Sequence, residues 1–300
     1  SAVDEGKVKS AAAAMVNSGL INHGWTYINT DDYWENNQRR GRTDPTLAGP
    51  ARSPDGNILP NKRFPDMKGL TDYIHARGLK CGLYSSPGPT TCGGCTGSYQ
   101  HEQQDATQWA AWGFDYIKYD WCSYGGIAGR NPDLAAMQKP YRVMRDALNH
   151  CDRDILFSLC QYGMGNVWEW GDQIGGNSWR TTGDIRDNWQ SMSSFGFGPN
   201  GHEKYAEPGH WNDPDMLVVG YVGWGPRLHP SGLTPNEQYT HISLWCLLDA
   251  PLLIGCDMTK LDSFTLGLLT NDEVLAVNQD ALGKQAARVL KTGPGGMIEV

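Results

Sequence analysis

The feature that most constrains this chain is an alternation of short β-branched or aromatic runs with helix-like segments. The strand-like runs each end in polar residues and occupy 27–32, 79–84, 116–120, 155–160, 179–184, 210–215 and 251–257. Helical spacing or capping signals mark the intervening residues 11–17, 67–74, 105–112, 141–148 and 234–245, with a further start signal at 270–273. Strands that alternate with helices predict parallel pairing through βαβ units.

The number of strands favours one kind of α/β fold over another. Seven candidate strands before residue 260 predict an eight-stranded (β/α)8 TIM barrel rather than a doubly wound sheet. No glycine-rich dinucleotide fingerprint follows the first strand, which disfavours the Rossmann alternative. From about Leu282 the pattern changes, and Gly293-Pro-Gly-Gly296 predicts a turn before a β element. We therefore expect a catalytic barrel over 1–285 and the start of a C-terminal β-rich domain over 286–300.

Composition excludes several classes of partner. The formal net charge of −8 is unfavourable for a nucleic-acid-binding surface, which needs a basic stripe. No apolar run reaches the roughly 18 residues that a membrane span requires.

Cys92 and Cys95 have the C-x-x-C spacing of zinc and redox sites, but no second such pair and no H-E-x-x-H motif occurs. The sequence therefore predicts no metal site.

In a barrel, the active site collects at the carboxyl ends of the strands. Those ends carry a set of polar residues, most of them acidic: Asp31, Asp32, Tyr84, Lys118, Asp120, Gln161, Arg180, Asp184, Asp213, Asp215 and Asp257. So many carboxylates at one rim would repel one another in a purely structural protein. Their presence favours a polyhydroxylated ligand, whose hydroxyls donate hydrogen bonds to them.

Two of these carboxylates suit catalysis. Asp120 ends a strand with Lys118 two residues earlier, so the ammonium shares its face and can keep the carboxylate ionised, as a nucleophile requires. Asp184 follows Arg180 just past a strand and is a candidate proton donor. This pairing is that of a retaining glycosidase. The structural alternative is a strand-end ion pair at Asp120 and a helix cap at Asp184.

Six motifs carry a resemblance to a known family. They occupy 27–34, 82–88, 116–122, 179–185, 211–216 and 278–284. In order and spacing, over nearly the whole chain, the sequence resembles the α-galactosidases (melibiases) of glycoside hydrolase family 27. The resemblance implies Asp120 as the nucleophile and Asp184 as the general acid/base.

The resemblance also implies a set of sugar-binding residues. Asp31 and Asp32 match the pair that binds the outer hydroxyls of galactose, and Lys118 and Arg180 match cations that bind the sugar. The remaining matched positions line the pocket: Tyr84, Cys92, Gln161, Tyr162, Asp215 and Met216. Cys92 and Cys122 match a family disulfide, which displaces the zinc interpretation and implies a secreted, periplasmic or otherwise extracytoplasmic location.

The sequence departs from the family at two places. No segment like the family's first barrel strand precedes Ala11, so we expect a barrel that lacks its first strand in this chain. Plant-type relatives have Glu-Trp where this chain has Gln161 and Tyr162. Gln161 and Met164 are long side chains that would fill the space that an acetamido group needs, which favours galactose.

The activity expected from the resemblance is retaining hydrolysis of terminal α-galactosides by double displacement, with no metal or organic cofactor. The expected partner is an α-galactoside oligosaccharide or glycoconjugate. The alternatives are an α-N-acetylgalactosaminidase or β-L-arabinopyranosidase of the same family, or a non-catalytic sugar-binding barrel.

Overall fold

A computed structural model of the chain describes residues 3–39, 41, 44–198, 201–223, 227–292 and 298–299. The described residues form two compact units. The first lies within 1–161 and 173–176, and the second within 162–172 and 177–300.

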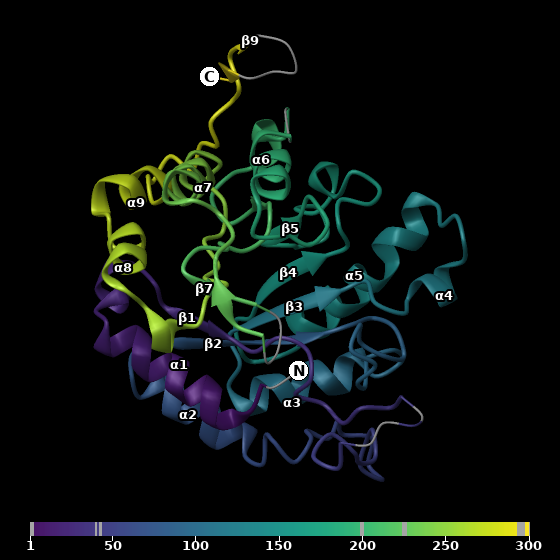
Figure 1. Cartoon of the computed structure of the whole chain (residues 1–300). Helices are drawn as coiled ribbons and strands as arrows, with labels where there is room; N and C mark the ends of the chain where they lie inside the picture. The colour runs from purple at the N-terminus through teal and green to yellow at the C-terminus, as the bar shows by residue number, and fades with distance from the viewer. Residues whose placement is uncertain are drawn as a thin grey trace. The chain divides into compact units, whose positions relative to one another are not determined.

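The first unit is built on a parallel sheet. Its strands are hydrogen-bonded in chain order: β1 (Tyr27–Asn29), β2 (Lys80–Ser85), β3 (Tyr116–Asp120) and β4 (Leu156–Cys160). The helices that precede or connect them are α1 (Glu5–Asn17), η1 (Leu20–His23), α2 (Met67–His75), α3 (Glu102–Trp112), α4 (Gly125–Ala128) and α5 (Leu134–Asn149). Figure 1 shows α2 and α3 running alongside these strands. This parallel β/α succession confirms the α/β class and is that of a TIM-barrel-like fold.

Local sequence explains these elements. In α2 the Asp66 carboxylate caps the helix by accepting from the backbone N–H of Gly69, and Leu70 and Ile74 bury one face. Gly82 lies opposite Asn29 in the parallel register of β1 and β2. A Cβ at Gly82 would lie 2.1 Å from the Asn29 amide oxygen and 2.7 Å from the Tyr116 ring, so a larger residue would displace these side chains.

The second unit contains one parallel strand pair and a set of helices. The strands β5 (Ser178–Arg180) and β6 (Trp211–Asp213) are parallel, whereas β7 (Tyr221–Val222) with β8 (His229–Pro230) and β9 (Lys291–Thr292) with β10 (Ile298–Glu299) are antiparallel. The helices are η2 (Val167–Glu169), α6 (Trp189–Phe197), η3 (Glu203–Tyr205), α7 (Pro235–Leu247), η4 (Met258–Lys260), α8 (Ser263–Leu269) and α9 (Asp272–Asn278).

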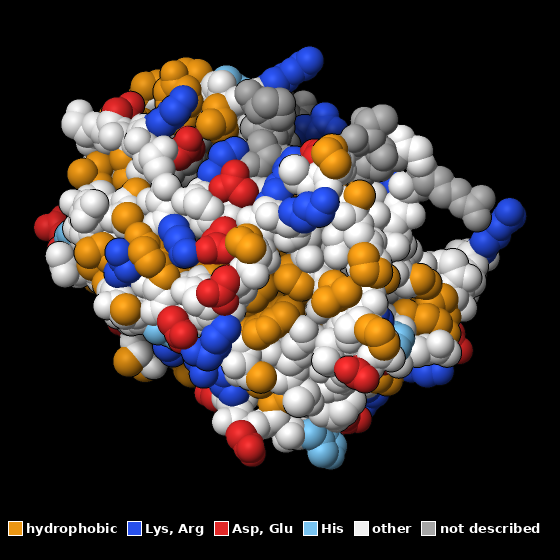
Figure 2. Space-filling model, turned by 90° about the horizontal axis from the view of Figure 1, so that it is seen from below, with side chains coloured by type: hydrophobic (Ala, Val, Ile, Leu, Met, Phe, Trp, Pro, Cys, Tyr) orange, Lys and Arg blue, Asp and Glu red, His pale blue; other side chains and the backbone are white. Residues whose placement is uncertain are grey.

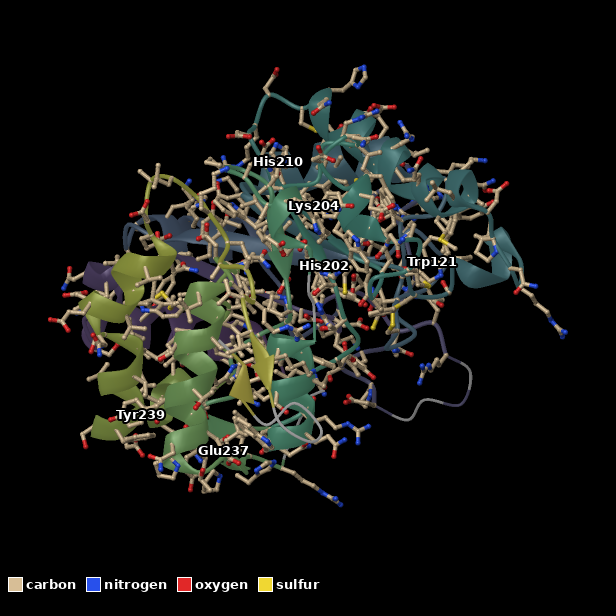
Figure 3. The ribbon with its side chains drawn as sticks, turned by 90° about the horizontal axis from the view of Figure 1, so that it is seen from above. Trp121, His202, Lys204, His210, Glu237 and Tyr239 are labelled. Carbon is tan, nitrogen blue, oxygen red and sulfur yellow. A yellow bond between two sulfur atoms is a disulfide. The ribbon has the colours of Figure 1, made fainter. Side chains whose placement is uncertain are left out.

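A capping box starts the helix that the sequence predicts over 234–245. The Thr234 hydroxyl accepts from the backbone N–H of Glu237, and the Glu237 carboxylate accepts from the backbone N–H of Thr234 at 2.7 Å. Figure 3 shows Glu237 at this end of α7. Pro235 occupies the first turn, where its missing N–H leaves no hydrogen bond unmade.

One predicted strand is wrong. Residues 251–257 make only an isolated bridge, in which Ile254 pairs with Leu217, and no strand forms there. Pro251 has no N–H to donate, and the two ladder hydrogen bonds around Leu217 are not continued. Asp257, expected at a strand end, instead caps η4 by accepting from Thr259. The turn predicted at 293–296 lies outside the described residues.

Figure 2 shows acidic and basic side chains interspersed on the face that it presents. In the part of the chain that the structure describes, none of the helices is both long and apolar enough to cross a bilayer.

Candidate active site

In the first unit, the carboxyl end of β3 carries two of the predicted site residues. Lys118 lies opposite Tyr84 in the register of β2 and β3, and Asp120 is the last residue of β3. The Lys118 ammonium forms an ion pair with Asp31 at 2.8 Å and lies 5.3 Å from the centre of the Tyr84 ring. Asp31 follows β1, so three neighbouring strands supply these side chains.

Asp120 is held by a phenol. Its side chain is buried, and the Tyr84 hydroxyl donates to Asp120 Oδ2 over 3.2 Å. Burial raises the pKa of Tyr84, and the charge of Asp120 raises it further, so the phenol stays protonated and remains a donor. The backbone carbonyl of Tyr84 accepts from the indole N–H of Trp34 at 2.8 Å, which fixes the strand from the other side.

Asp32 has a dense hydrogen-bond environment. Its Oδ1 accepts from the Thr91 hydroxyl and from the backbone N–H of Tyr33, both at 2.7 Å, and its Oδ2 accepts from the backbone N–H of Gly93 at 2.5 Å. A side chain at Gly93 would lie 2.8 Å from Asp32 Oδ2, so glycine is required for this approach. Burial raises the pKa of Asp32, and these three donors counteract that rise.

The predicted disulfide is present. Cys92 and Cys122 are bonded, with their Cα atoms 4.9 Å apart, and Cys122 follows β3 by two residues. The Cys122 sulfur lies 3.4 Å from the Tyr84 hydroxyl, so the disulfide borders the residue that holds Asp120. Cys81 and Cys246 are buried free thiols, as the apolar stretches around them predict.

In the second unit, one buried arginine joins two acidic residues. The Arg180 guanidinium, at the end of β5 and 3% exposed, lies 3.1 Å from Asp215 and 3.3 Å from Asp184. It also donates to the backbone carbonyl of Gly183 at 2.5 Å. Asp184 is 73% exposed. Asp184 and Asp215 therefore share one cation, the Arg180 guanidinium.

Asp215 has a constrained backbone. Its φ of 84° lies in the left-handed region that non-glycine residues seldom adopt. Four hydrogen bonds hold this conformation: the carboxylate accepts from the backbone N–H groups of Ile185 and Met216, its own N–H donates to Asp213, and its carbonyl accepts from Trp245. Backbone strain of this kind clusters at functional sites.

The loop after β4 begins with the fully buried Gln161, followed by Tyr162 with a φ of 62°. Within the second unit, Met164 and Met216 are half-buried. Trp170 is buried and donates to the Gly165 carbonyl, so its ring is part of the core of the second unit. Trp168 is half-buried and stacks on His202, whose position Figure 3 labels, with ring centres 3.8 Å apart.

Sequence reasoning missed the residues that support the site. Thr91 and Gly93 hold Asp32, Trp34 holds Tyr84, and Trp245 holds Asp215. These contacts join residues that are about 30 to 60 positions apart, so a local sequence pattern does not predict them. The spacing of Gly93 between Cys92 and Cys95 was visible but was attributed to a C-x-x-C motif.

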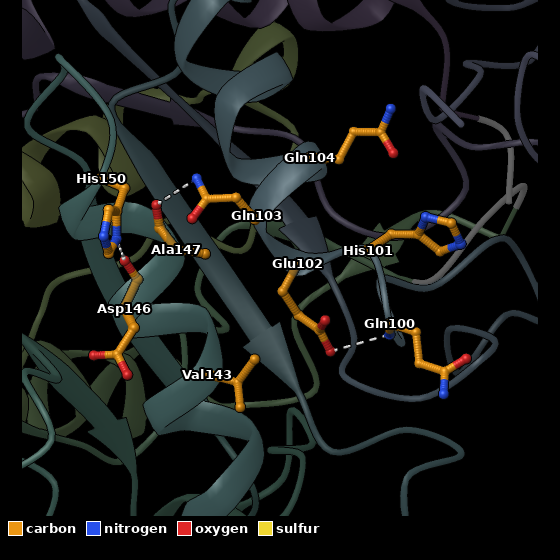
Figure 4. Close-up of a pocket in the computed structure, with 9 residues that line it drawn as sticks. All are labelled: Gln100, His101, Glu102, Gln103, Gln104, Val143, Asp146, Ala147 and His150. Carbon is orange, nitrogen blue, oxygen red and sulfur yellow. Dashed lines mark hydrogen bonds between the residues drawn. The ribbon is translucent and has the colours of Figure 1, made fainter. Parts of the chain in front are cut away.

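A separate cavity carries none of the predicted site residues. It has a volume of about 430 Å³ and lies between α3 and α5, lined by residues that include Glu102, Gln103, Val143 and His150 (Figure 4). Glu102 is occupied in accepting from the backbone N–H of Gln100, and Gln103 donates to the Ala147 carbonyl. We do not assign the chemistry to this cavity.

Fold and side chains thus define an α/β, TIM-barrel-like protein with carboxylates at its strand ends. Comparison with known proteins gives the family. The family model Melibiase_2, described as alpha galactosidase A, matches residues 1–280, and the chain belongs to this family.

Individual relatives agree with the family model. The chain is 42% identical to alpha-galactosidase A of Cellvibrio japonicus and 43% identical to alpha-galactosidase 2 of Arabidopsis thaliana, each over 97% of this chain. It covers 67% and 66% of those proteins, so it spans about two thirds of their length. The crystal structure of alpha-galactosidase I from Mortierella vinacea matches 97% of this chain and 72% of that chain, with 34% identity and a TM-score of 0.84.

The disulfide gives a direct prediction. Peptide mapping without reduction is expected to recover Cys92 and Cys122 in one cross-linked peptide pair, because their side chains are bonded. Cys246, a buried free thiol, serves as the control and should react with an alkylating reagent only after unfolding. Recovery of Cys92 and Cys122 as alkylated free thiols from the native protein would contradict the assignment.

Proposed function

We propose that the protein is a retaining exo-α-galactosidase that hydrolyses terminal α-D-galactosyl residues through a covalent glycosyl-Asp120 intermediate. The observation that carries the proposal is the buried carboxylate of Asp120 at the end of β3, held by the Tyr84 phenol beside the Cys92–Cys122 disulfide. Family membership and the alpha-galactosidase names of the relatives support it.

The first step is attack on the anomeric carbon. The Tyr84 hydroxyl donates to Oδ2 of Asp120, which orients the carboxylate so that the other oxygen attacks. A fixed carboxylate lowers the barrier because the sugar and the nucleophile need not be oriented during reaction. As the bond forms, the glycosidic bond breaks and its electron pair passes to the leaving oxygen.

The leaving oxygen takes a proton from Asp184. This carboxyl is exposed, and Arg180 lies 3.3 Å from it in an ion pair. Asp184 then deprotonates a water, whose oxygen attacks the anomeric carbon. The bond from that carbon to Asp120 breaks, its electron pair returns to the carboxylate, and galactose leaves with retention. Side chains supply every proton transfer and the covalent step in this scheme.

The other matched residues would bind galactose. Asp31 and Asp32 accept hydrogen bonds from its outer hydroxyls, and Lys118 and Arg180 donate to it. The remaining residues that we propose for binding are Tyr84, Cys92, Gln161, Tyr162, Asp215 and Met216. The ligand would be an α-galactoside oligosaccharide or glycoconjugate.

Two further proposals concern the rest of the protein. We propose that 1–285 form the catalytic barrel and that 286–300 begin a β-rich domain, for which the antiparallel pairing of β9 with β10 gives support. We also propose an extracytoplasmic location, because a disulfide persists in an oxidising compartment.

The nucleophile is tested by substitution. Hydrolysis of 4-nitrophenyl α-D-galactoside is expected for the wild type, and Asp120→Asn should lower kcat by several orders of magnitude because the attacking group is lost. Circular dichroism should show an unchanged fold, since the amide keeps the shape of the carboxyl. An Asp120→Asn variant with near-wild-type kcat would disprove the role, and an inactive wild type that binds galactose would favour the non-catalytic barrel.

The acid/base is tested with a pair of substrates. Asp184→Ala should slow hydrolysis of substrates with poor leaving groups, such as melibiose, far more than that of activated aryl galactosides, because only the former need protonation in the first step. The ratio of kcat/KM for the two substrates is the measurement. An equal loss on both would contradict the role of Asp184.

Specificity follows from the loop after β4 and from Asp31. Galactose should be preferred over N-acetylgalactosamine by about ten- to a few-hundred-fold, because Gln161 and Met164 would fill the space of an acetamido group. Asp31 favours galactose over arabinopyranose, since the arabinopyranosidases of this family have a longer Glu at the matching position. The measurement is kcat/KM for the three 4-nitrophenyl glycosides. A preference for the acetamido sugar or for β-L-arabinopyranoside would contradict the specificity and leave the roles of Asp120 and Asp184 standing.

A further inference from the structure

One buried acid in the first unit has no structural explanation. Glu35 follows β1 by six residues, is 0% exposed, and has no hydrogen-bond partner for either carboxylate oxygen among the described residues. Its backbone carbonyl accepts from the Asn61 amide, and the residue forms an isolated antiparallel bridge with Pro60. A carboxyl left alone in the interior costs several kcal/mol if it is ionised, on the order of the penalty for an uncompensated buried charge. Burial accordingly raises its pKa well above the usual range.

Two further ligand-type side chains face Glu35. A carboxylate oxygen of Glu35, a carboxylate oxygen of Asp32 and the sulfur of Cys95 all lie within 4.8 Å of one another. Cys95 is a buried free thiol, the second cysteine of the C-x-x-C motif that the disulfide does not use. The sequence separates Asp32 from Cys95 by some 60 positions, so the fold alone creates this cluster.

The loop around the cluster is rigidly built. The Thr91 hydroxyl donates to Asp32 Oδ1 and accepts from the backbone N–H of Cys95, which ties two of the three groups together. The Asn37 amide donates to the Cys95 sulfur at 3.3 Å and to the Gly93 carbonyl at 2.9 Å. Asp32 Oδ2 accepts from the backbone N–H of Gly93, and a carboxylate oxygen can accept more than one such bond.

A divalent cation would offset the cost of burying the ionised carboxylate of Glu35. Two carboxylates and a thiolate together match the oxygen and sulfur donors that zinc takes in proteins, whereas calcium and magnesium avoid sulfur. Ligand atoms in a tetrahedral zinc site are roughly 3.5 Å apart, so side-chain movements of roughly 1 Å would close the cluster around the ion. Water would supply the fourth ligand.

We propose that Asp32, Glu35 and Cys95 form a buried binding site for a thiophilic divalent cation of the zinc class. The site is distinct from the catalytic pair and requires no role for Asp120 or Asp184. Because Asp32 is also a proposed galactose ligand, an ion there would also hold this carboxylate in place.

A second cluster in the same unit is a weaker candidate. His75, Cys81 and Asp115 also lie within 4.8 Å of one another. There the Asp115 carboxylate already pairs with Arg153 at 2.5 Å and with His75 at 2.8 Å. The guanidinium would repel a further cation, and the Asp115 carboxylate already has two partners.

The experiment measures metal directly. The purified protein is stripped with a chelator and titrated with Zn²⁺ alone, with bound metal determined by elemental analysis, and then with Co²⁺ as a spectroscopic probe. We expect about one Zn²⁺ per chain and a sulfur-to-cobalt charge-transfer band in the near ultraviolet. Glu35→Gln and Cys95→Ser should each weaken Zn²⁺ binding by roughly 10- to 100-fold or more, and Cys95→Ser should abolish the band.

Two matched controls separate this site from other thiols. Cys246→Ser removes a buried free thiol outside both clusters, and Cys81→Ser removes the thiol of the second cluster, so both should keep the band. Absence of bound metal and of the band in the wild type would overturn the proposal and leave Glu35 as a protonated acid. A band that survives in Cys95→Ser would overturn it as well. The wild-type result does not depend on any variant folding, and none of these readouts depends on galactosidase activity.

Discussion

The register of β3 between its two neighbours is the constraint on which the first unit's chemistry depends. Tyr84 lies opposite Lys118, and Asp120 lies opposite Cys160, in parallel ladders. Side chains two positions apart on a strand share a face, so Lys118 and Asp120 both point to the side that Tyr84 borders. A slip of one residue would turn both away. The Cys92–Cys122 disulfide and the glycine at position 93 then fix the loops that approach this face.

In the second unit, the candidate site depends on the ion pair between Arg180 and Asp215. Asp215 is buried in a strained conformation, and Arg180 is the buried cation that pairs with it. Removing one member of such a pair leaves an uncompensated charge and typically costs about 3–5 kcal/mol. The same guanidinium reaches Asp184, so the residue that stabilises Asp215 also positions the proposed acid/base.

Much of the fold was predictable, because strand and cap signals are local. The run before Asp120 and the capping box at Thr234 both formed where the sequence predicted them. The run at 251–257 failed because an apolar stretch does not reveal whether a neighbouring strand is available to continue its ladder. The short helices α4, α6 and α8 were missed because their apolar residues follow no sustained helical period.

The residues of the candidate site also fall into a group that the sequence indicates and a group that it does not. Polar residues at strand ends, such as Asp31 and Arg180, were found because a barrel gathers strand ends at one rim. The partners of Asp32 and Asp215 were not found, because Thr91 and Trp245 reach them across long loops. Glu35 was also missed, because an acid inside a loop sequence reads as a surface residue until the fold shows that it is buried.

We propose that Asp120 carries the sugar as a covalent ester. Incubation with a mechanism-based fluorinated galactosyl inactivator, followed by protease digestion and mass spectrometry, tests it most directly. We expect one galactosyl label per chain, on the peptide that contains Asp120, and none in Asp120→Asn. A label on the peptide that contains Asp184, or on neither, would contradict the role of Asp120 as the nucleophile.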